Sequence, residues 1–164
     1  MATWFTADTH FGHANILKHC NRPFASVTEM DAALIANWNA RVVPGDDIWC
    51  LGDFCRGSPD RYGPHLNGRK HLIIGNHDRP SAQVWDGWAS VQPYADLKLD
   101  DVRLILFHYP IAEWNGFYRG SLHLYGHVHG QREPTRQSCD VGVDCWDYRP
   151  VSLDELRERM VASG

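Results

Sequence analysis

The amino-acid sequence predicts a domain of the α/β class. Short apolar runs bounded by glycine, proline, asparagine and aspartate predict strands, and one long segment carries apolar residues at helical spacing. Helical and strand patterns alternate in the first half of the chain, and the second half contains more strand. The chain has 164 residues and shows no repeat, low-complexity tract or linker. We therefore expect one domain that spans residues 1–164.

The first half contains three apolar runs that predict strands over residues 2–7, 47–53 and 69–75. A helix is predicted over residues 26–42, where Ser26 and Glu29 resemble a capping box. The apolar face of this helix would contain Met30, Ala33, Leu34, Asn37 and Trp38.

Two shorter helices are also predicted in the first half. One is a weak helix in the segment rich in proline and glycine from residue 57 to 68, and the other covers residues 80–88.

The second half begins with an alternating segment, residues 95–108, that predicts a hairpin turning at Asp100 and Asp101. Further strands are predicted within residues 121–130 and 138–146. A helix over residues 151–160 follows, with Ser152 and Glu155 as its capping box.

Composition excludes several classes of protein. The net charge is −4, so the chain has no basic footprint for nucleic acid and no polybasic patch for a membrane surface. No run approaches the roughly 20 apolar residues of a membrane helix, and the first residues do not form a signal peptide. The five cysteines include no CxxC pair, so reduced thiols in a cytoplasmic protein are expected, with packing as their role.

Five predicted strands run into a turn that begins with aspartate, asparagine or histidine. Because functional groups gather at the carboxyl ends of strands in layered α/β folds, we expect these side chains to lie together. Carboxylates, imidazoles and an amide, without thiolates, suit divalent Mn, Fe, Zn, Ni or Co. The residues are Asp8, His10, Asp53, Asn76, His77, His108, His127 and His129.

Each of these residues also has a simpler interpretation. His108 in "LFHYP" resembles an ordinary core histidine, and His77 could serve only as a helix cap. His127 and His129 would point to the same side of an extended segment, which suits metal binding but also occurs by chance. A structural zinc site usually has four ligands, often thiolates, so an excess of oxygen and nitrogen ligands favours an open catalytic pair.

In this order along the chain, the motifs "DTH", "GD", "GNHD", "H" and "GHVH" resemble the signature of the calcineurin-like metallophosphoesterase superfamily. The resemblance runs from Asp8 to His129. The stretches "ADTHFGHANI" and "HLYGHVHG" are similar to a small bacterial and phage branch of phosphoesterases. The resemblance implies a single-domain β-sandwich flanked by helices, in α-β-β-α layers, with a metal site at the carboxyl ends of the strands.

The resemblance also implies two divalent metal ions, with Mn favoured. Asp8, His10, Asp53 and His129 would hold the first ion, and Asn76, His108 and His127 would complete the second. Asp53 would bridge the ions, and a bridging hydroxide would attack phosphorus in line with the leaving oxygen. His77 matches the histidine that protonates the leaving oxygen or holds the phosphate.

One part of the family pattern is missing. Many relatives continue "GDxxDR" after the bridging aspartate, whereas this chain reads "GDFCRGS" and lacks the second aspartate. What orients His77 is therefore open, and Asp78 could orient a neighbour or begin a helix. The residues expected on the substrate side are His13, Asn15 and Arg56, although a helix cap also explains Asn15. Arg22, Arg79 and Arg119 are further phosphate candidates, but for each of them we favour a solvated position on the surface.

The chain has no long insertion that could cover the site, so we expect an open pocket, which permits phosphodiesters, cyclic phosphodiesters or nucleic-acid ends as well as monoesters. The favoured substrate is a small phosphodiester or a nucleotide-like molecule. A phosphomonoester phosphatase and a nuclease acting on nucleic-acid ends are the alternatives. The acidic balance of the chain disfavours long nucleic acid. A noncatalytic metal-bound binding module ranks lower, because it predicts lost ligands or a lost His77, and all are present.

Overall fold

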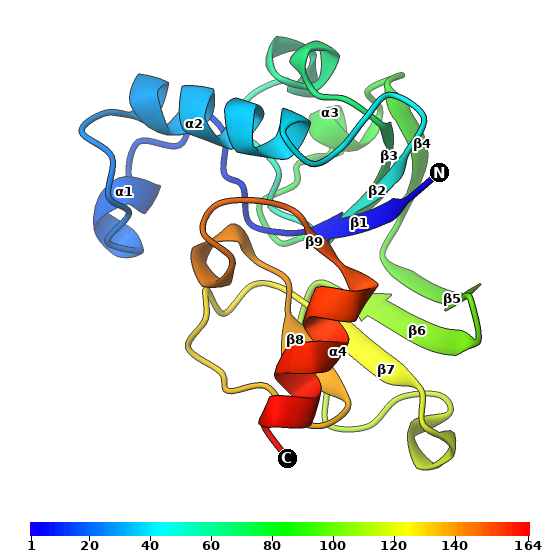
Figure 1. The fold of residues 1–164 in the computed structure, drawn as a ribbon. Coiled ribbons are helices and arrows are strands. Elements are labelled where there is room, and N and C mark those ends of the chain that lie inside the picture. The colour runs from blue at the N-terminus through cyan, green and yellow to red at the C-terminus, as the bar shows by residue number, and fades with distance from the viewer.

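The computed structural model describes residues 1–164 and shows two β-sheets with helices against them (Figure 1). The first sheet has the strand order β4-β3-β2-β1-β9, in which β1 to β4 are parallel and β9 is antiparallel to β1. Its strands are β1 (Thr3–Thr6), β2 (Asp47–Cys50), β3 (Arg69–Ile73), β4 (Trp88–Gln92) and β9 (Val151–Ser152). The α/β class is confirmed.

The second sheet has the order β5-β6-β7-β8. Its first two strands form the predicted hairpin, in register from Tyr94 opposite Phe107 to Leu99 opposite Val102, and the other neighbours are parallel. The strands are β5 (Tyr94–Leu99), β6 (Val102–Phe107), β7 (Leu122–Tyr125) and β8 (Ser138–Asp140). The predicted segment 138–146 is therefore strand only at its start, and Val143–Cys145 forms the 3-10 helix η4.

The main core lies between the two sheets. Phe5 of β1 and Leu51, which directly follows β2, pack with Leu104 and Leu124 of the second sheet, and all four side chains are fully buried. Helix α4 (Leu153–Ala162) adds Leu156 to the same core and lies beside β8 and β9. Burial of this apolar surface, at about 25 cal/mol per Å², fixes the distance between the sheets and hence between the loops that each sheet presents.

The capping box that begins α4 is confirmed. Ser152 accepts a hydrogen bond from the backbone N–H of Glu155, and the Glu155 carboxylate accepts one from the backbone N–H of Ser152. No helix of the chain has the combined length and apolar character needed to span a bilayer.

Helix α2 (Val27–Asn39) covers the outer face of the first sheet (Figure 1). Met30, Leu34 and Trp38 are buried there, as the helical spacing predicts. Ser26 caps the helix by accepting from the backbone N–H of Glu29. The Glu29 carboxylate accepts from the N–H of Ala25 instead of Ser26, so the box is displaced by one residue.

The shorter elements differ from the sequence prediction. Residues 57–68 form two 3-10 helices, η1 (Pro59–Arg61) and η2 (Gly63–His65), because their prolines and glycines interrupt a longer helix. Helix α3 (Pro80–Gln83) ends before the predicted boundary, and strand β4 follows. The sequence did not predict β4, which is short and pairs only at the edge of the sheet. The single-turn helix α1 (Ile16–His19) was also not predicted.

A loop and the 3-10 helix η3 (Phe117–Arg119) lie against the outer face of the second sheet. They cover His123, whose ring packs 5.0 Å from Trp114, measured between ring centroids. The Nδ1–H of His123 donates to the Ile105 carbonyl at 3.0 Å, and Nε2 accepts from the Ile111 backbone N–H at 3.3 Å. The neutral ring satisfies both bonds, so this histidine is a packing residue.

We expect the stability that His123 contributes to be lost at acid pH. Burial lowers the pKa of His123 to about 4, against 6.5 for the free side chain. The unfolded chain therefore binds more protons than the folded chain between these values, and unfolding becomes easier as the pH falls from 6.5 to 4. The difference corresponds to roughly 3 kcal/mol.

Urea unfolding of chelator-treated protein at pH 7.5 and pH 4.5 will measure this effect. His123→Gln should unfold with a weaker pH dependence than the natural protein, by up to that amount. The exposed His65→Gln variant is the control, and an equal pH dependence in all three proteins would contradict the expectation.

Candidate metal centre

The candidate residues converge where strands of both sheets end. The loops after β1 and β2 are joined by hydrogen bonds from the Asp8 N–H to the Gly52 carbonyl and from the His10 N–H to the Asp53 carbonyl, both 3.0 Å. The loops after β6 and β7 are joined by a 2.9 Å bond from the Gly126 N–H to the His108 carbonyl. Backbone bonds therefore hold in place the loops that present the polar side chains.

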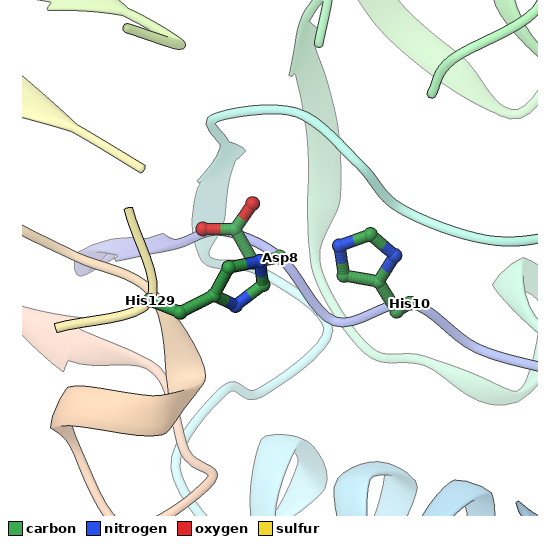
Figure 2. A group of neighbouring side chains, drawn as sticks. All are labelled: Asp8, His10 and His129. Carbon is green, nitrogen blue, oxygen red and sulfur yellow. The ribbon is translucent and has the colours of Figure 1, made fainter. Parts of the chain in front are cut away.

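Asp8, His10 and His129 form a first group of ligand atoms that all lie within 4.8 Å of one another. Figure 2 shows Asp8 and His10 on one segment and His129 approaching from the loop after β7. The Oδ2 atom of Asp8 accepts from the His127 backbone N–H at 2.8 Å. Asp8 Oδ1 and His10 Nε2 are buried and have no hydrogen-bond partner. Such orphaned buried atoms are costly unless a cation takes the missing place, so this group fits a metal ion.

Asp53, His108 and His127 form a second group with the same spacing. The Nδ1–H of His108 donates to the Leu51 carbonyl at 2.6 Å, which leaves Nε2 as the atom that faces the site. Burial lowers the pKa of His108, but Asp53 outweighs burial and raises it, so a cation that binds at Nε2 would displace a proton. Asn76 Oδ1 lies 3.0 Å from that Nε2 and 3.2 Å from His127 Nδ1. Once Nε2 is deprotonated, electron-pair donors face one another, which is the arrangement that a bound cation stabilises.

Asp53 lies between the two groups. Its Oδ2 atom is 3.7 Å from His10 Nε2 in the first group and 3.4 Å from His108 Nε2 in the second. Its Oδ1 atom accepts from the His77 backbone N–H at 2.8 Å. One carboxylate oxygen is thus held by the protein, while the other faces ligands of both groups. This is the position that a bridging carboxylate requires.

Five of the seven candidate ligands have a left-handed backbone conformation, with φ between 49° and 72°. Non-glycine residues rarely adopt this conformation, and clusters of such residues occur at functional sites. The five are Asp8, His10, Asp53, His127 and His129. An uncommon backbone conformation is thus shared by most of the side chains that meet at this site.

Asp78 fixes the geometry of two loops, a role that the sequence left open. Its carboxylate accepts from the backbone N–H groups of Asp53 at 2.8 Å, Phe54 at 3.0 Å and Gly75 at 2.7 Å. Gly75 must be glycine, because a Cβ atom there would lie 2.4 Å from Asp53 Oδ1. The loops after β2 and β3 are therefore held together directly behind the candidate bridge.

A buried ion pair supports His129, and the sequence analysis missed it. His129 Nδ1 donates to Asp144 Oδ2 at 2.8 Å, and Asp144 also accepts from Arg22 at 2.9 and 3.0 Å. Arg22 is only 4% exposed and donates to the carbonyls of Asp8 and Thr9. The interpretation of Arg22 as a surface charge is therefore wrong. The one sequence feature that could have indicated this pair is Asp144, an acidic residue within the otherwise apolar stretch "VGVDCW".

Cys20 has a place beside the same pair but not a separate metal site. Its sulfur lies within 4.8 Å of a nitrogen of His129 and an oxygen of Asp144. Asp144 is already bound by Arg22, so a cation there would be repelled by a guanidinium.

Two of the three residues expected on the substrate side, His13 and Asn15, line a cleft of about 450 Å³ beside the two groups. His13 lies there with its Nδ1 atom 3.2 Å from His10 Nδ1. Asn15 also lines the cleft and makes no capping hydrogen bond, although it precedes α1. His77 lines the cleft and an adjoining cavity, where Arg56 is found. Arg119 lines neither space.

Burial and neighbouring charges separate the pKa values of the site. Burial raises the pKa of Asp8 to about 7 and lowers that of His10 to about 3. Burial also opposes ionisation of Asp53, but His108 outweighs it and the pKa falls to about 2. Burial disfavours a charged His129, yet Asp144 raises its pKa to about 10. Asp53 and His129 therefore carry charge at neutral pH before any ion is bound.

Comparison of the sequence with other proteins finds relatives that match most of the chain. No family model matches the chain. An uncharacterized protein of Methanocaldococcus jannaschii, MJ1445, is 32% identical over 92% of this chain and 86% of its own length. The gene 66 protein of Mycobacterium phage D29 is 30% identical over 94% of each chain, and that of phage L5 is 29% identical.

Two solved structures share the fold. A protein of unknown function from Aquifex aeolicus, AQ665, has a TM-score of 0.78 and 27% identity over 95% of this chain and 97% of its own. The phosphoesterase YfcE of E. coli has a TM-score of 0.50 and 21% identity over 87% of this chain and 78% of its own. The chain therefore belongs to the same family as MJ1445 and the phage gene 66 proteins, and its fold is that of the AQ665 and YfcE structures.

Proposed function

We propose that this protein is a metal-dependent phosphoesterase that hydrolyses a small phosphodiester or a nucleotide-like substrate. The observation that carries the proposal is the pair of ligand groups on either side of Asp53, at the floor of a cleft of about 450 Å³. Neither group includes a closed set of four thiolates or histidines, as a structural zinc site would.

The first ion would be held by Asp8, His10, Asp53 and His129. The second would be held by Asp53, Asn76, His108 and His127. When bound, two such ions neutralise phosphate charge and activate water as a nucleophile. The ligand types suit Mn, Fe, Zn, Ni or Co, and Mn is favoured.

His77 is the residue proposed to donate a proton to the leaving oxygen. Its side chain is exposed, and it lines both the cleft and the adjoining cavity. Its backbone N–H is bonded to Asp53, so its position is tied to that of the candidate bridge. Proton donation matters most when the leaving group is an alkoxide, as in natural nucleotides and diesters. His13 lines the cleft as well and can donate a hydrogen bond to a phosphate oxygen, whereas Arg56 lines the adjoining cavity.

The openness of the site allows a diester to bind as well as a monoester. Exposed Asn15, His19 and His77 line the cleft, so its mouth is open to solvent. A substrate with groups on both sides of phosphorus can therefore enter without a movement of the backbone.

The test is hydrolysis of bis-p-nitrophenyl phosphate and p-nitrophenyl phosphate by chelator-treated protein, with Mn²⁺ added or withheld. We expect release of nitrophenol only with metal, and a larger kcat/KM for the diester. Metal content measured in parallel by mass spectrometry should approach two ions per chain.

Other outcomes would identify the alternatives. Preference for the monoester would indicate a phosphatase. Two bound ions without hydrolysis of either compound would contradict the proposal for these esters and favour the noncatalytic binding module. The absence of bound metal would contradict the ligand assignment itself.

A further inference from the structure

A second cavity of about 430 Å³ adjoins the metal cleft. It shares His10, His13 and His77 with the cleft, but His127 and His129 do not line it. It therefore begins beside the first ligand group and extends away from the second, toward α3. Its remaining lining residues are Cys55, Arg56, Gly57, Arg79, Ser81 and Ala82.

The cavity is positively charged without internal compensation. The exposed Arg56 and Arg79 both line it, and its lining includes no carboxylate. The ion pairs of arginine in this chain are made by Arg22, Arg41, Arg69, Arg103 and Arg149. Two unpaired guanidinium groups thus share one concavity in a chain whose net charge is −4. Such a concavity concentrates anions.

Backbone hydrogen bonds fix the segments that carry the two arginines relative to the metal centre. Arg56 lies three residues after Asp53, and Arg79 lies two residues after His77. The carboxylate of Asp78 joins these two loops through the three backbone bonds described above. The Arg56 N–H also donates to the Phe11 carbonyl at 2.8 Å, which fixes the loop to the segment that carries His10. An anion in the cavity would therefore lie at a fixed place relative to the scissile phosphate.

We propose that this cavity is a subsite for a second phosphate group of the substrate. This inference rests on the proposed function and narrows its substrate class to nucleotide-like phosphoesters that carry a second phosphate group beside the scissile one. A fork of guanidinium donors suits a phosphate dianion, and the Ser81 hydroxyl adds a further donor. Pyrimidine or purine identity plays no part in the subsite, because none of its residues offers an aromatic platform other than histidine.

The test uses two chromogenic substrates that differ by one phosphate. They are thymidine 5′-(p-nitrophenyl phosphate) and the same compound with a 3′-phosphate. With Mn²⁺, the natural protein should have a KM about tenfold lower for the compound that carries the 3′-phosphate, since charge-assisted bonds to phosphate are strong. Arg79→Ala should bring the ratio of the two KM values close to one. The control is Arg119→Ala, because Arg119 is an exposed arginine outside the cavity, and it should keep the tenfold ratio.

A binding measurement separates this inference from the proposed function. Isothermal titration of the Mn²⁺-loaded protein should show tighter binding of thymidine 3′,5′-bisphosphate than of thymidine 5′-monophosphate. Arg79→Ala should remove the difference. Salt at about 0.5 M should reduce it, because that concentration screens the attraction between exposed charges. Equal KM values together with equal affinities in the natural protein would overturn the subsite. If neither thymidine ester is hydrolysed, the result would count against the proposed function. The titration would still decide whether the subsite exists.

Discussion

Asp53→Asn is expected to lower metal-dependent hydrolysis of bis-p-nitrophenyl phosphate by at least about 10³-fold, equivalent to roughly 4 kcal/mol of transition-state stabilisation. Asparagine keeps the size of the side chain and one carbonyl oxygen. It loses the negative charge whose Oδ2 atom faces His10 at 3.7 Å and His108 at 3.4 Å. Both ions should therefore bind more weakly, because Asp53 is the one carboxylate that faces both groups.

The experiment measures Mn²⁺ content and turnover for Asp53→Asn beside Asp86→Asn. Asp86 lies exposed in the turn between α3 and β4 and serves as a charge-matched control. Circular dichroism of both variants tests whether they fold. A folded Asp53→Asn protein with two tightly bound ions and undiminished turnover would contradict the bridging assignment.

Arg22→Met is expected to reduce the free energy of unfolding by about 3–5 kcal/mol, because it leaves the buried Asp144 without its cationic partner. The guanidinium also donates to the Asp8 carbonyl at 2.6 Å and to the Thr9 carbonyl at 2.9 Å. Its loss therefore loosens the segment that carries two candidate ligands. Weaker metal binding should accompany the lower stability, since partners that orient ligands typically contribute 10–100-fold to affinity.

Urea unfolding of the chelator-treated proteins is the measurement. Arg103→Met provides the contrast, because Arg103 pairs with Asp96 at a position where its side chain is 48% exposed. That variant should lose no more than about 1 kcal/mol. The double variant Arg22→Met with Asp144→Leu should lose less than the sum of the two single variants, because no buried charge is then left unpaired. Similar losses for Arg22→Met and Arg103→Met would show that burial of the Arg22 pair does not matter.

The sequence predicted those parts of the fold in which local pattern and burial agree. The strands ending near Asp8, Asp53 and His108 are short apolar runs, so their periodicity and their place in the core point to the same structure. The helix that carries Trp38 was found for the same reason. The convergence of polar side chains followed from the rule that the carboxyl ends of parallel strands meet at one edge.

The sequence did not reveal features that depend on distant partners. Trp88 begins β4, but the preceding apolar residues extended a helical pattern across it. Arg22 and Asp144 are separated by 122 positions, so neither residue alone shows that they form a pair. Asp78 acts through three backbone N–H groups, and no side-chain motif records such bonds.

The left-handed backbone at five candidate ligands lowers the stability of the protein at the positions that its proposed activity requires. Each such residue costs on the order of 1 kcal/mol relative to glycine, which adopts the conformation freely. A glycine at position 8, 10, 53, 127 or 129 would relieve that strain and remove a ligand in the same step. Laboratory selection for thermal stability alone would therefore favour the loss of these ligands. Selection for turnover would keep them, together with a free energy of unfolding lower than the same core could otherwise provide.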